Sequence, residues 1–342
     1  MVSFIIPVYN GSAYVEKSVY SIINTCKWDY EIIIIDDGST DDTKNIVSKI
    51  TKINNNVKYY YENNSGVSCS RNLGIEVAKG DWICFVDADD IFDGSKCNAN
   101  LDSSMDMVIY SKSFPSEAVY NPQQKKDRFF LISCILKQAE CSVYNQCYLN
   151  SVWSKLYNKR MLVKNNIKFN PNLINGEDCL FNINCYKFAQ TVRCIPISVY
   201  NYRISFNSAT KRYSPKIAKS DIAFLSYLRK AINEFSNGDE NRWNHLYCQT
   251  AINGLWITLF SGICHYKNNV SLKKCKEMIL EQAKDPVYKE AIKALSRKTT
   301  LISLPQKIVL KSIFTPFCYL SILALRIKTR KRKAKQDLLI NL

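Results

Sequence analysis

The sequence predicts an α/β fold in which a mostly parallel sheet is flanked by helices and is followed by a C-terminal helical subdomain. Between residues 2 and 90, short apolar runs of strand length alternate with segments of helical periodicity, as in parallel sheets with helical crossovers. Across residues 217–294 the periodicity is helical throughout, in about three helices. The 342 residues have room for one large domain and a smaller one.

The first strand is predicted over the apolar run at residues 2–8. Pro7 lacks an N–H and is expected to mark the end of that strand, with residues 9–11 forming the turn. Ser12 has the side chain of an N-cap, and the helix after it should present one apolar face. That face consists of Val15, Val19, Ile22 and Ile23.

A second buried strand is predicted at residues 31–35, followed by the acidic segment 36–42. Ser39 and Asp42 have the spacing of a capping box for a helix running to Ile50. The carboxylates of Asp36 and Asp37 stand where this strand ends. Helix capping is the alternative explanation for a carboxylate at position 37.

The third strand is predicted at residues 57–61 and the third helix at 66–78, closed by Gly80. A fourth apolar run, 83–86, is followed at once by Asp87, Asp89 and Asp90. Adjacent carboxylates repel one another unless a cation lies between them. Mn²⁺ or Mg²⁺, held by one or two carboxylates and a substrate phosphate, would supply that charge. A solvated acidic turn is the alternative.

These polar segments all follow the carboxyl ends of predicted parallel strands, where open α/β sheets bind their ligands. We therefore expect residues 7–10, Asp36 and Asp37, Arg71 and residues 87–90 to converge on one crevice. The sequence has neither a GxGxxG nor a GxxxxGK[ST] motif to hold phosphates. A metal held by carboxylates would take that role in a nucleotide site.

Composition narrows the class of partner. Lys and Arg total 47 against 30 Asp and Glu, and a net charge of +17 indicates a polyanionic partner: nucleic acid, an anionic membrane or a phosphorylated substrate. The 14 cysteines contain no CxxC pair, so we expect buried, reduced thiols. No leader-like segment precedes the first predicted strand, which favours a cytoplasmic location.

Four motifs together resemble a known family. FIIPVYN, EIIIIDDGSTDDT, GVSCSRNLGI and GDWICFVDADD, in this order and spacing, resemble the family 2 glycosyltransferases, specifically the bacterial enzymes that build cell-surface polysaccharide or O-antigen. The dense match covers about the first 115 residues. Residues 153–157 and 176–181 are similar to the family's W-x-K-L-Y and G-E-D-x-x-F segments, which extends the resemblance to about Ser208. It implies the GT-A fold, a Rossmann-like sheet flanked by helices.

The resemblance also implies roles for individual residues. Asp36 or Asp37 would accept a hydrogen bond from the uracil N3–H, and Arg71 would contact the base or a phosphate. Asp89 would bind the metal, while Asp87 would reach the ribose or the metal shell. The segment expected to wrap the uridine consists of Pro7, Val8, Tyr9 and Asn10.

Asp178 would be the catalytic base, with Glu177 as its neighbour. The alternatives are that this pair is an ordinary acidic first turn of a helix running to Phe188, and that Arg71 merely neutralises nearby acids. Trp153 is a candidate acceptor-stacking residue, although core packing is the more usual role of a tryptophan.

The predicted reaction is a single displacement on a UDP-sugar. A metal would stabilise the departing diphosphate, and one carboxylate would deprotonate the acceptor hydroxyl. With an α-linked hexose donor (Glc, Gal or an N-acetylhexosamine), inversion gives a β-linkage. The acceptor expected from the resemblance is a saccharide on a polyprenyl diphosphate lipid. A catalytically silent partner of another transferase, and a DxD-type phosphatase, are the alternative functions.

Three domains are expected: a nucleotide-sugar-binding and catalytic domain at residues 1–210, a helical acceptor-side subdomain at 211–298, and a membrane-associating segment at 299–342. In the first, two short strands are predicted within residues 191–205. The basic side chains of Lys211, Arg212 and Lys216 follow, in a loop that could close over the pyrophosphate or remain solvated.

The C-terminal segment has an amphipathic composition. Its uninterrupted apolar part, residues 312–325, has 14 residues, whereas a membrane-spanning helix needs about 20. We therefore expect a helix lying in the membrane interface. Seven basic residues between positions 326 and 335 would bind anionic lipid on the cytoplasmic face of the plasma membrane. A nucleic-acid-binding tail is disfavoured, since no aromatic residues interleave these charges.

Overall fold

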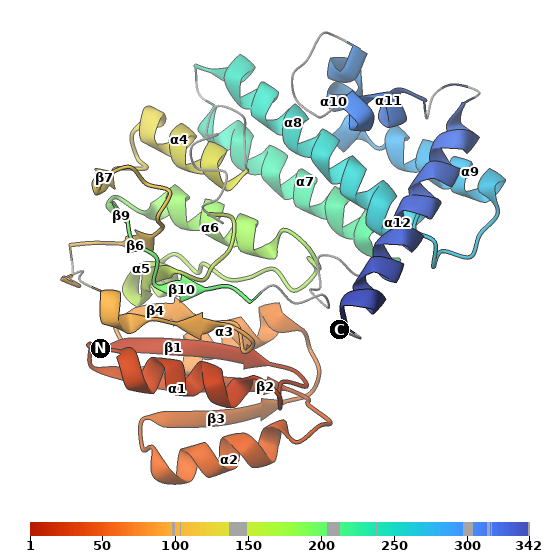
Figure 1. Cartoon of the computed structure of the whole chain (residues 1–342). Coiled ribbons are helices and arrows are strands. Elements are labelled where there is room, and N and C mark those ends of the chain that lie inside the picture. The colour runs from red at the N-terminus through yellow and green to blue at the C-terminus, as the bar shows by residue number, and fades with distance from the viewer. Residues whose placement is uncertain are drawn as a thin grey trace. The chain divides into compact units, whose positions relative to one another are not determined.

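The computed structural model describes residues 1–97, 100–102, 104–136, 149–203, 213–236, 238–296, 304–312, 315 and 317–340 (Figure 1). The chain forms two compact units. The first comprises Met1–Pro171 and Glu177–Arg203, and the second comprises Asn172–Gly176 and Ile204–Leu342. The loop residues Lys211 and Arg212 lie outside the described part of the chain.

The first unit is built on an eight-stranded sheet of order β3-β2-β1-β4-β8-β6-β9-β7. Its parallel half confirms the predicted alternation of strand and helix. The strands of this half are β1 (Val2–Val8), β2 (Tyr30–Asp37), β3 (Val57–Glu62) and β4 (Trp82–Phe85). The carboxyl ends of β2, β1 and β4 are therefore neighbours at one edge of the sheet.

β1 spans Val2–Val8, the range predicted for the first strand. Pro7 was expected to mark its end but lies within it. β1 continues to Val8, and Pro7 pairs with Ile35 of β2. The strand tolerates this proline because β4 pairs with β1 only as far as Ile5. The missing N–H therefore removes no bond to β4.

Three helices connect the parallel strands, and each buries an apolar face: α1 (Val15–Thr25), α2 (Thr43–Ile53) and α3 (Val67–Val77). Both predicted N-caps are wrong, because α1 and α2 are preceded by Tyr14 and Asp42 without a side-chain cap hydrogen bond. Ser39 instead accepts a hydrogen bond from the Asn10 N–H in the neighbouring loop. The Ser39 side chain, which was expected to cap the helix that follows it, instead connects the loops after β1 and β2.

The rest of the first unit extends the sheet and supplies three more α-helices within the described residues. β8 (Lys155–Asn158) runs antiparallel to both β4 and β6 (Met107–Tyr110). The two strands predicted within residues 191–205 are confirmed as β9 and β10. The remaining elements are β5 (Ile91–Phe92), the 3₁₀ turn Gly94–Lys96, β7 (Ala118–Tyr120), α4 (Lys125–Ile135), α5 (Lys159–Lys164), α6 (Glu177–Phe188), β9 (Val192–Ile195) and β10 (Tyr200–Asn201).

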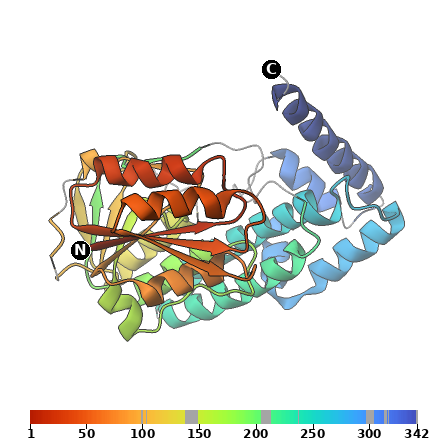
Figure 2. The same cartoon turned by 90° about the horizontal axis from the view of Figure 1, so that it is seen from below.

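The second unit is helical, as predicted (Figures 1 and 2). Four α-helices occupy residues 217–296 where about three had been predicted, and a π-helical turn, Leu259–Ile263, extends α8. The α-helices of the unit are α7 (Ile217–Phe235), α8 (Glu240–Thr258), α9 (Leu272–Lys284), α10 (Pro286–Ser296), α11 (Leu304–Ser312) and α12 (Cys318–Ile340). None of the helices in the described residues is both long and apolar enough to cross a bilayer.

The C-terminal apolar segment differs from its prediction. Residues 312–325 do not form one helix, because α11 ends at Ser312 and α12 begins at Cys318. The sequence between them contains Pro316, which has no N–H to donate within a helix. The basic residues predicted to follow the apolar helix lie on α12 itself.

The cysteine prediction is confirmed for the described part of the chain. All twelve cysteines there are free thiols, and all except the partly buried Cys26 and Cys69 are buried. Burial raises the pKa of several of them, including Cys84 and Cys185, which keeps the thiols protonated and unreactive.

Candidate active site

The loops after β1 and β2 are tied together by hydrogen bonds. The Asn10 N–H donates to Ser39 Oγ over 2.8 Å, and the Thr40 N–H donates to Asn10 Oδ1 over 2.8 Å. Asn10 has a φ of 50°, in the left-handed region that asparagine tolerates better than most residues. Tyr9, beside it, is 54% exposed. The predicted uridine-wrapping segment thus combines a fixed backbone with an exposed aromatic ring.

Asp36 and Asp37 lie in the last two positions of β2 and are both buried. Asp36 accepts hydrogen bonds from the Ser39 N–H at 2.8 Å and from the Tyr59 hydroxyl at 2.7 Å. Asp37 accepts from the Ser65 N–H at 2.6 Å, and from the Gly66 N–H immediately before α3. Asp36 therefore fixes the loop after β2 and Asp37 fixes the loop before α3, and neither carboxylate caps α2.

The three carboxylates after β4 have different environments. Asp90 is fully buried, and accepts hydrogen bonds from the Tyr200 hydroxyl and the Arg203 N–H, both at 2.7 Å. Burial raises its pKa to about 7. Asp87 and Asp89 are partly exposed, and burial together with the charge of Asp87 raises the pKa of Asp89. Asp90 therefore anchors the turn, whereas Asp87 and Asp89 remain partly exposed.

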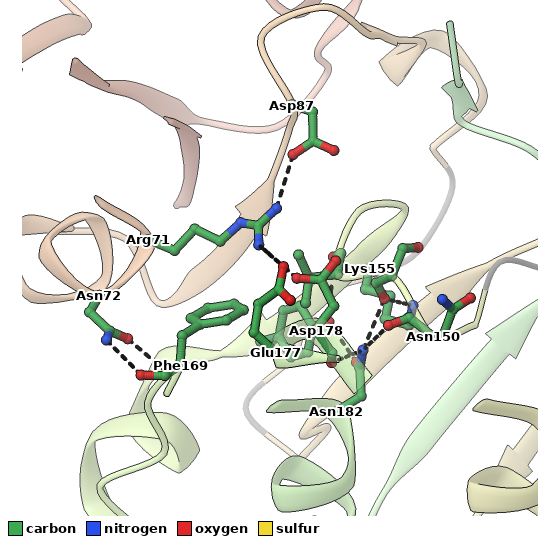
Figure 3. A network of polar contacts seen from close by, with 12 residues as sticks. Arg71, Asn72, Asp87, Asn150, Lys155, Phe169, Glu177, Asp178 and Asn182 are labelled. Carbon is green, nitrogen blue, oxygen red and sulfur yellow. Dashed lines mark hydrogen bonds and ion pairs between the residues drawn. The ribbon is translucent and has the colours of Figure 1, made fainter. Parts of the chain in front are cut away.

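Arg71 joins the acids after β4 to those at the start of α6 (Figure 3). Its Nη2 lies 3.1 Å from Asp87 Oδ1, and its Nη1 lies 2.6 Å from Asp178 Oδ1 and 3.8 Å from Glu177 Oε1. The guanidinium is 5% exposed and lies over the Phe169 ring. Arg71 and Asp178 are 107 residues apart in the sequence. We call Arg71, Asp87, Glu177 and Asp178 the Arg71 cluster.

The Arg71 cluster carries more negative than positive charge when all its groups are ionised. Burial raises the pKa of Glu177 to about 8, and the adjacent Asp178 adds to that shift. Burial also raises the pKa of Asp178, against the opposing charges of Arg71 and Lys155. A carboxylate whose pKa is raised toward neutrality is a better proton acceptor than an exposed aspartate, so Asp178 suits a general base.

Asp178 is held by groups from α6 and from the segment before β8. Asn182, one turn further along α6, is fully buried, and its Nδ2 donates to the carbonyls of Asp178 and Ser151, each at 2.9 Å. The Tyr157 hydroxyl of β8 donates to Asn182 Oδ1 at 2.8 Å. Lys155, 2% exposed, donates from Nζ to the Ser151 carbonyl. Figure 3 shows Asn182 and Lys155 beside the acid pair.

Comparison with known proteins identifies the family of the first part of the chain. The profile of glycosyl transferase family 2 matches residues 3–134. Residues 3–134 form a family 2 glycosyltransferase domain. The chain is similar to the putative glycosyltransferase EpsH of Bacillus subtilis (strain 168), with 26% identity over 310 residues and 85% coverage of both chains. It is also similar to the putative teichuronic acid biosynthesis glycosyltransferase TuaG of the same organism, with 36% identity over 107 residues that cover 31% of this chain and 42% of TuaG.

Solved structures show that the family 2 glycosyltransferase domain has the GT-A fold. S. aureus TarS 1–349 in complex with UDP-GlcNAc superposes with a TM-score of 0.59 at 18% identity, covering 96% of this chain and 91% of that one. The mannosyltransferase PcManGT from Pyrobaculum calidifontis, in complex with GDP-Man and Mn²⁺, superposes with a TM-score of 0.50 at 13% identity, covering 96% and 86%.

The donor set in this glycosyltransferase domain suits a divalent metal. Asp87 and Asp89 supply carboxylate oxygens, which Mg²⁺ and Mn²⁺ prefer, and burial together with the charge of Asp87 raises the pKa of Asp89 against the opposing charge of Arg203. No group of three or more His, Cys, Asp or Glu side chains able to hold a metal occurs in the described residues. A metal held by these two aspartates would have to take its remaining ligands from phosphate and water.

Trp153 lies in the core of the first unit. Its side chain is 9% exposed, and its ring stacks on Tyr200 at 4.4 Å and on Tyr202 at 5.8 Å between centroids. This packing explains a tryptophan at position 153, and Tyr202, 38% exposed, presents more aromatic surface than Trp153 does.

The structure brings four of the predicted site residues into direct contact, namely those of the Arg71 cluster. Pro7–Asn10, Asp36 and Asp37 lie at the same sheet edge on β1 and β2. Sequence reasoning gave no role to Asn182 or Lys155. A signal for Asn182 was available, because a polar residue four positions after Asp178 lies on the same side of the helix as Asp178.

Proposed function

We propose that the chain is a metal-dependent, inverting glycosyltransferase that moves one hexose (Glc, Gal or an N-acetylhexosamine) from a UDP-sugar to a hydroxyl of a lipid-linked saccharide. The product is a β-glycosidic bond in a cell-surface polysaccharide or O-antigen. The observation that carries this proposal is the contact of Arg71 with both Asp87 and Asp178. It brings the proposed metal-binding acids and the proposed base to one place in the fold.

The donor end of the site is proposed at the edge formed by β2, β1 and β4. Tyr9 offers an exposed ring to the uracil, and Asp36 or Asp37 accepts from its N3–H. Each carboxylate oxygen has two lone pairs, so the hydrogen bonds already made by these aspartates leave acceptor capacity for the base. The UDP and UDP-GlcNAc bound to TarS support a uridine nucleotide.

The proposed chemistry needs one base and no protein nucleophile. Asp178 takes the proton of the acceptor hydroxyl while that oxygen attacks the anomeric carbon from the face opposite the diphosphate. Glu177, whose pKa is raised to about 8, is held protonated beside Asp178 at neutral pH. Asp89, with Asp87, would hold Mn²⁺ or Mg²⁺, which stabilises the negative charge of the departing diphosphate.

Arg71 also has a proposed part in the reaction. In the structure its guanidinium shares its charge between Asp87 and Asp178. A bound diphosphate beside Asp87 would attract the same guanidinium. We propose that Arg71 then contacts phosphate and that its pairing with Asp178 weakens, which leaves the base available to the acceptor.

The proposed acceptor is a saccharide on a polyprenyl diphosphate, at the cytoplasmic face of the plasma membrane. EpsH is a putative glycosyltransferase, and TuaG is a putative teichuronic acid biosynthesis glycosyltransferase, which supports a polysaccharide product. The net charge of +17 suits a surface rich in anionic lipid. We assign Trp153 no acceptor contact of its own beyond supporting the exposed Tyr202.

The decisive experiment measures transfer by the purified full chain with Mn²⁺, a panel of UDP-hexoses and a synthetic GlcNAc-diphospho-lipid. We expect one UDP-sugar to release UDP only when the acceptor is present, and EDTA to stop the reaction. Proton NMR of the product should show a β-anomeric coupling. An α-linked product would exclude inversion, and full activity in EDTA would exclude the metal.

Asp178→Asn tests the assignment of the base. The amide preserves the shape of the side chain but cannot accept the proton, so we expect UDP affinity to survive and transfer to fall about a hundredfold or more. The matched control is Asp29→Asn on the exposed surface. Undiminished transfer by Asp178→Asn would remove Asp178 from the mechanism. UDP binding without any transfer by the wild-type chain would instead favour a catalytically silent partner of another transferase.

A further inference from the structure

The C-terminal part of the chain has a one-sided charge composition. Residues 291–336 contain twelve Lys and Arg residues and no Asp or Glu. The positive charge of this segment favours contact with a polyanion over contact with the rest of the chain, which is basic as well. α12 begins within this segment and carries its densest group of basic residues, from Arg326 onward.

One face of α12 is packed on its own unit. Cys318, Ile322, Leu325 and Thr329 are each at most 3% exposed and recur at helical spacing. This inward face contacts α9 and the π-helical turn Leu259–Ile263. Arg326 donates from Nη2 to the carbonyl of Val270 at 2.6 Å. The orientation of α12 about its own axis is therefore fixed.

The opposite side of α12, which we call the outward face, is apolar and then basic. Leu320 is 67% exposed, Leu323 43% and Ile327 49%. At 100° per residue these three side chains and the exposed Arg330 and Lys331 lie within about a third of the helix circumference. Phe317, just before the helix, is 65% exposed. A helix face meant for water would carry polar side chains at positions 320, 323 and 327.

We propose that the outward face of α12 binds the surface of an anionic membrane, with the helix lying in the plane of the interface. Leu320, Leu323 and Ile327 would enter the boundary between headgroups and acyl chains, and Arg330 and Lys331 would pair with lipid phosphates. A second copy of this chain is a poorer partner, because association would bring two chains of charge +17 together. Nucleic acid is poorer still, because the exposed apolar side chains on α12 at positions 320, 323 and 327 are aliphatic and do not stack on bases.

This inference sharpens the membrane partner named under the proposed function, and its test needs no catalysis. The full chain is sedimented with vesicles of phosphatidylcholine alone or mixed with phosphatidylglycerol. We expect binding to the mixed vesicles only. Leu320→Gln with Leu323→Gln should weaken that binding about tenfold or more without changing net charge. Arg330→Gln with Lys331→Gln should weaken it about twentyfold.

Matched controls separate the outward face from general surface properties. Ile53→Gln with Val163→Gln removes two equally exposed apolar side chains from the first unit, and Lys44→Gln with Lys49→Gln removes two exposed charges from α2. Both controls should bind the mixed vesicles as the wild type does. Circular dichroism checks that each variant is folded.

Three outcomes would overturn the proposal: equal binding to uncharged vesicles, unchanged binding by the Leu320 and Leu323 variant, or a dimer in analytical ultracentrifugation that this variant abolishes while vesicle binding persists. The last outcome would assign the outward face to a second copy. Asp178→Asn should bind vesicles fully. A failure of the membrane proposal therefore leaves the transferase proposal standing, and the reverse also holds.

Discussion

At the scale of the residue, Arg71 explains how four ionisable groups can share a buried site. A guanidinium presents several donors in one plane, so it can bind Asp87 through one nitrogen and Asp178 through another. A lysine ammonium is a point charge and could not span both carboxylates in the same way. The family resemblance implied that Arg71 contacts the nucleotide base or a phosphate. In the structure Arg71 pairs with the carboxylates of Asp87 and Asp178.

Removing Arg71 should be costly, because its acidic partners stay behind. We expect Arg71→Met to lower the free energy of unfolding by about 3–5 kcal/mol, the range for leaving buried charge uncompensated. Urea denaturation at neutral pH measures this. The control is Arg193→Met, which breaks the more exposed pair with Glu117 and should cost about 1 kcal/mol or less. A loss for Arg71→Met as small as the control's would mean that the acids are already protonated.

At the scale of the element, the site depends on how α6 is joined to the segment before β8. Asn182 satisfies the carbonyls of Asp178 and Ser151 and accepts from Tyr157. These bonds set the position of the first turn of α6, and with it the direction of the Asp178 side chain. We infer that Asn182 is a positioning residue that does not itself touch substrate.

Asn182→Ala should therefore affect transfer more than nucleotide binding. Four polar groups each lose a partner, so we expect a loss of stability of about 2–3 kcal/mol. They are the Tyr157 hydroxyl and the carbonyls of Asn150, Ser151 and Asp178. Transfer at saturating donor should fall severalfold, while UDP affinity by calorimetry stays near wild type. Asn165→Ala removes a single bond to the Met161 carbonyl at a half-buried position and serves as the control. Equal losses of UDP affinity and transfer would indicate general damage.

The sequence predicted the elements of the first unit because its strands are apolar runs bounded by polar turns. The positions of the four parallel strands, α3 and α6 follow from those patterns. Ser12 and Ser39 were misassigned as caps, since backbone N–H groups of one loop bind side chains of the other, across about 29 residues. The contact between Arg71 and Asp178 joins segments 107 residues apart, which no local pattern encodes. Only the family resemblance indicated Asp178.

At the scale of the whole molecule, both units bury carboxyl groups with raised pKa values. In the first unit, burial raises the pKa of Asp90 to about 7 and that of Glu177 to about 8. In the second, burial raises the pKa of Asp221 to about 7, and its partner is the Tyr288 hydroxyl. The folded chain therefore holds protons that the unfolded chain releases at about pH 4.

The pH dependence of stability follows from these shifts. A carboxyl group with a raised folded pKa contributes stability that is fully present below its unfolded pKa and is lost as pH rises through the folded pKa. We expect the melting temperature in metal-free buffer to fall between pH 5 and pH 9. Asp221, 6% exposed, should contribute on the order of 3 kcal/mol to this fall.

Asp221→Asn tests how much of the pH dependence of stability comes from the second unit. Scanning calorimetry across that pH range should show a flatter curve for Asp221→Asn than for the wild type, with the exposed Asp29→Asn as control. Mn²⁺ with UDP should raise the melting temperature more at pH 8 than at pH 5, since the raised pKa of Asp89 makes its ionised, metal-binding form more abundant at the higher pH. A wild-type melting temperature that rises from pH 5 to pH 9 would contradict the raised pKa values of Asp90, Glu177 and Asp221.

The shared guanidinium of Arg71 makes the acids around it interdependent. If Asp87 loses its charge, the guanidinium of Arg71 can pair with Asp178 alone. If Asp178 loses its charge, the guanidinium can pair with Asp87 alone. The change in the free energy of unfolding or of activation caused by one substitution in the Arg71 cluster is therefore not the contribution of that residue alone. It also includes the new pairing of the residues that remain. Natural variation should follow the same constraint, with substitutions at positions 71, 87 and 178 tending to arise together.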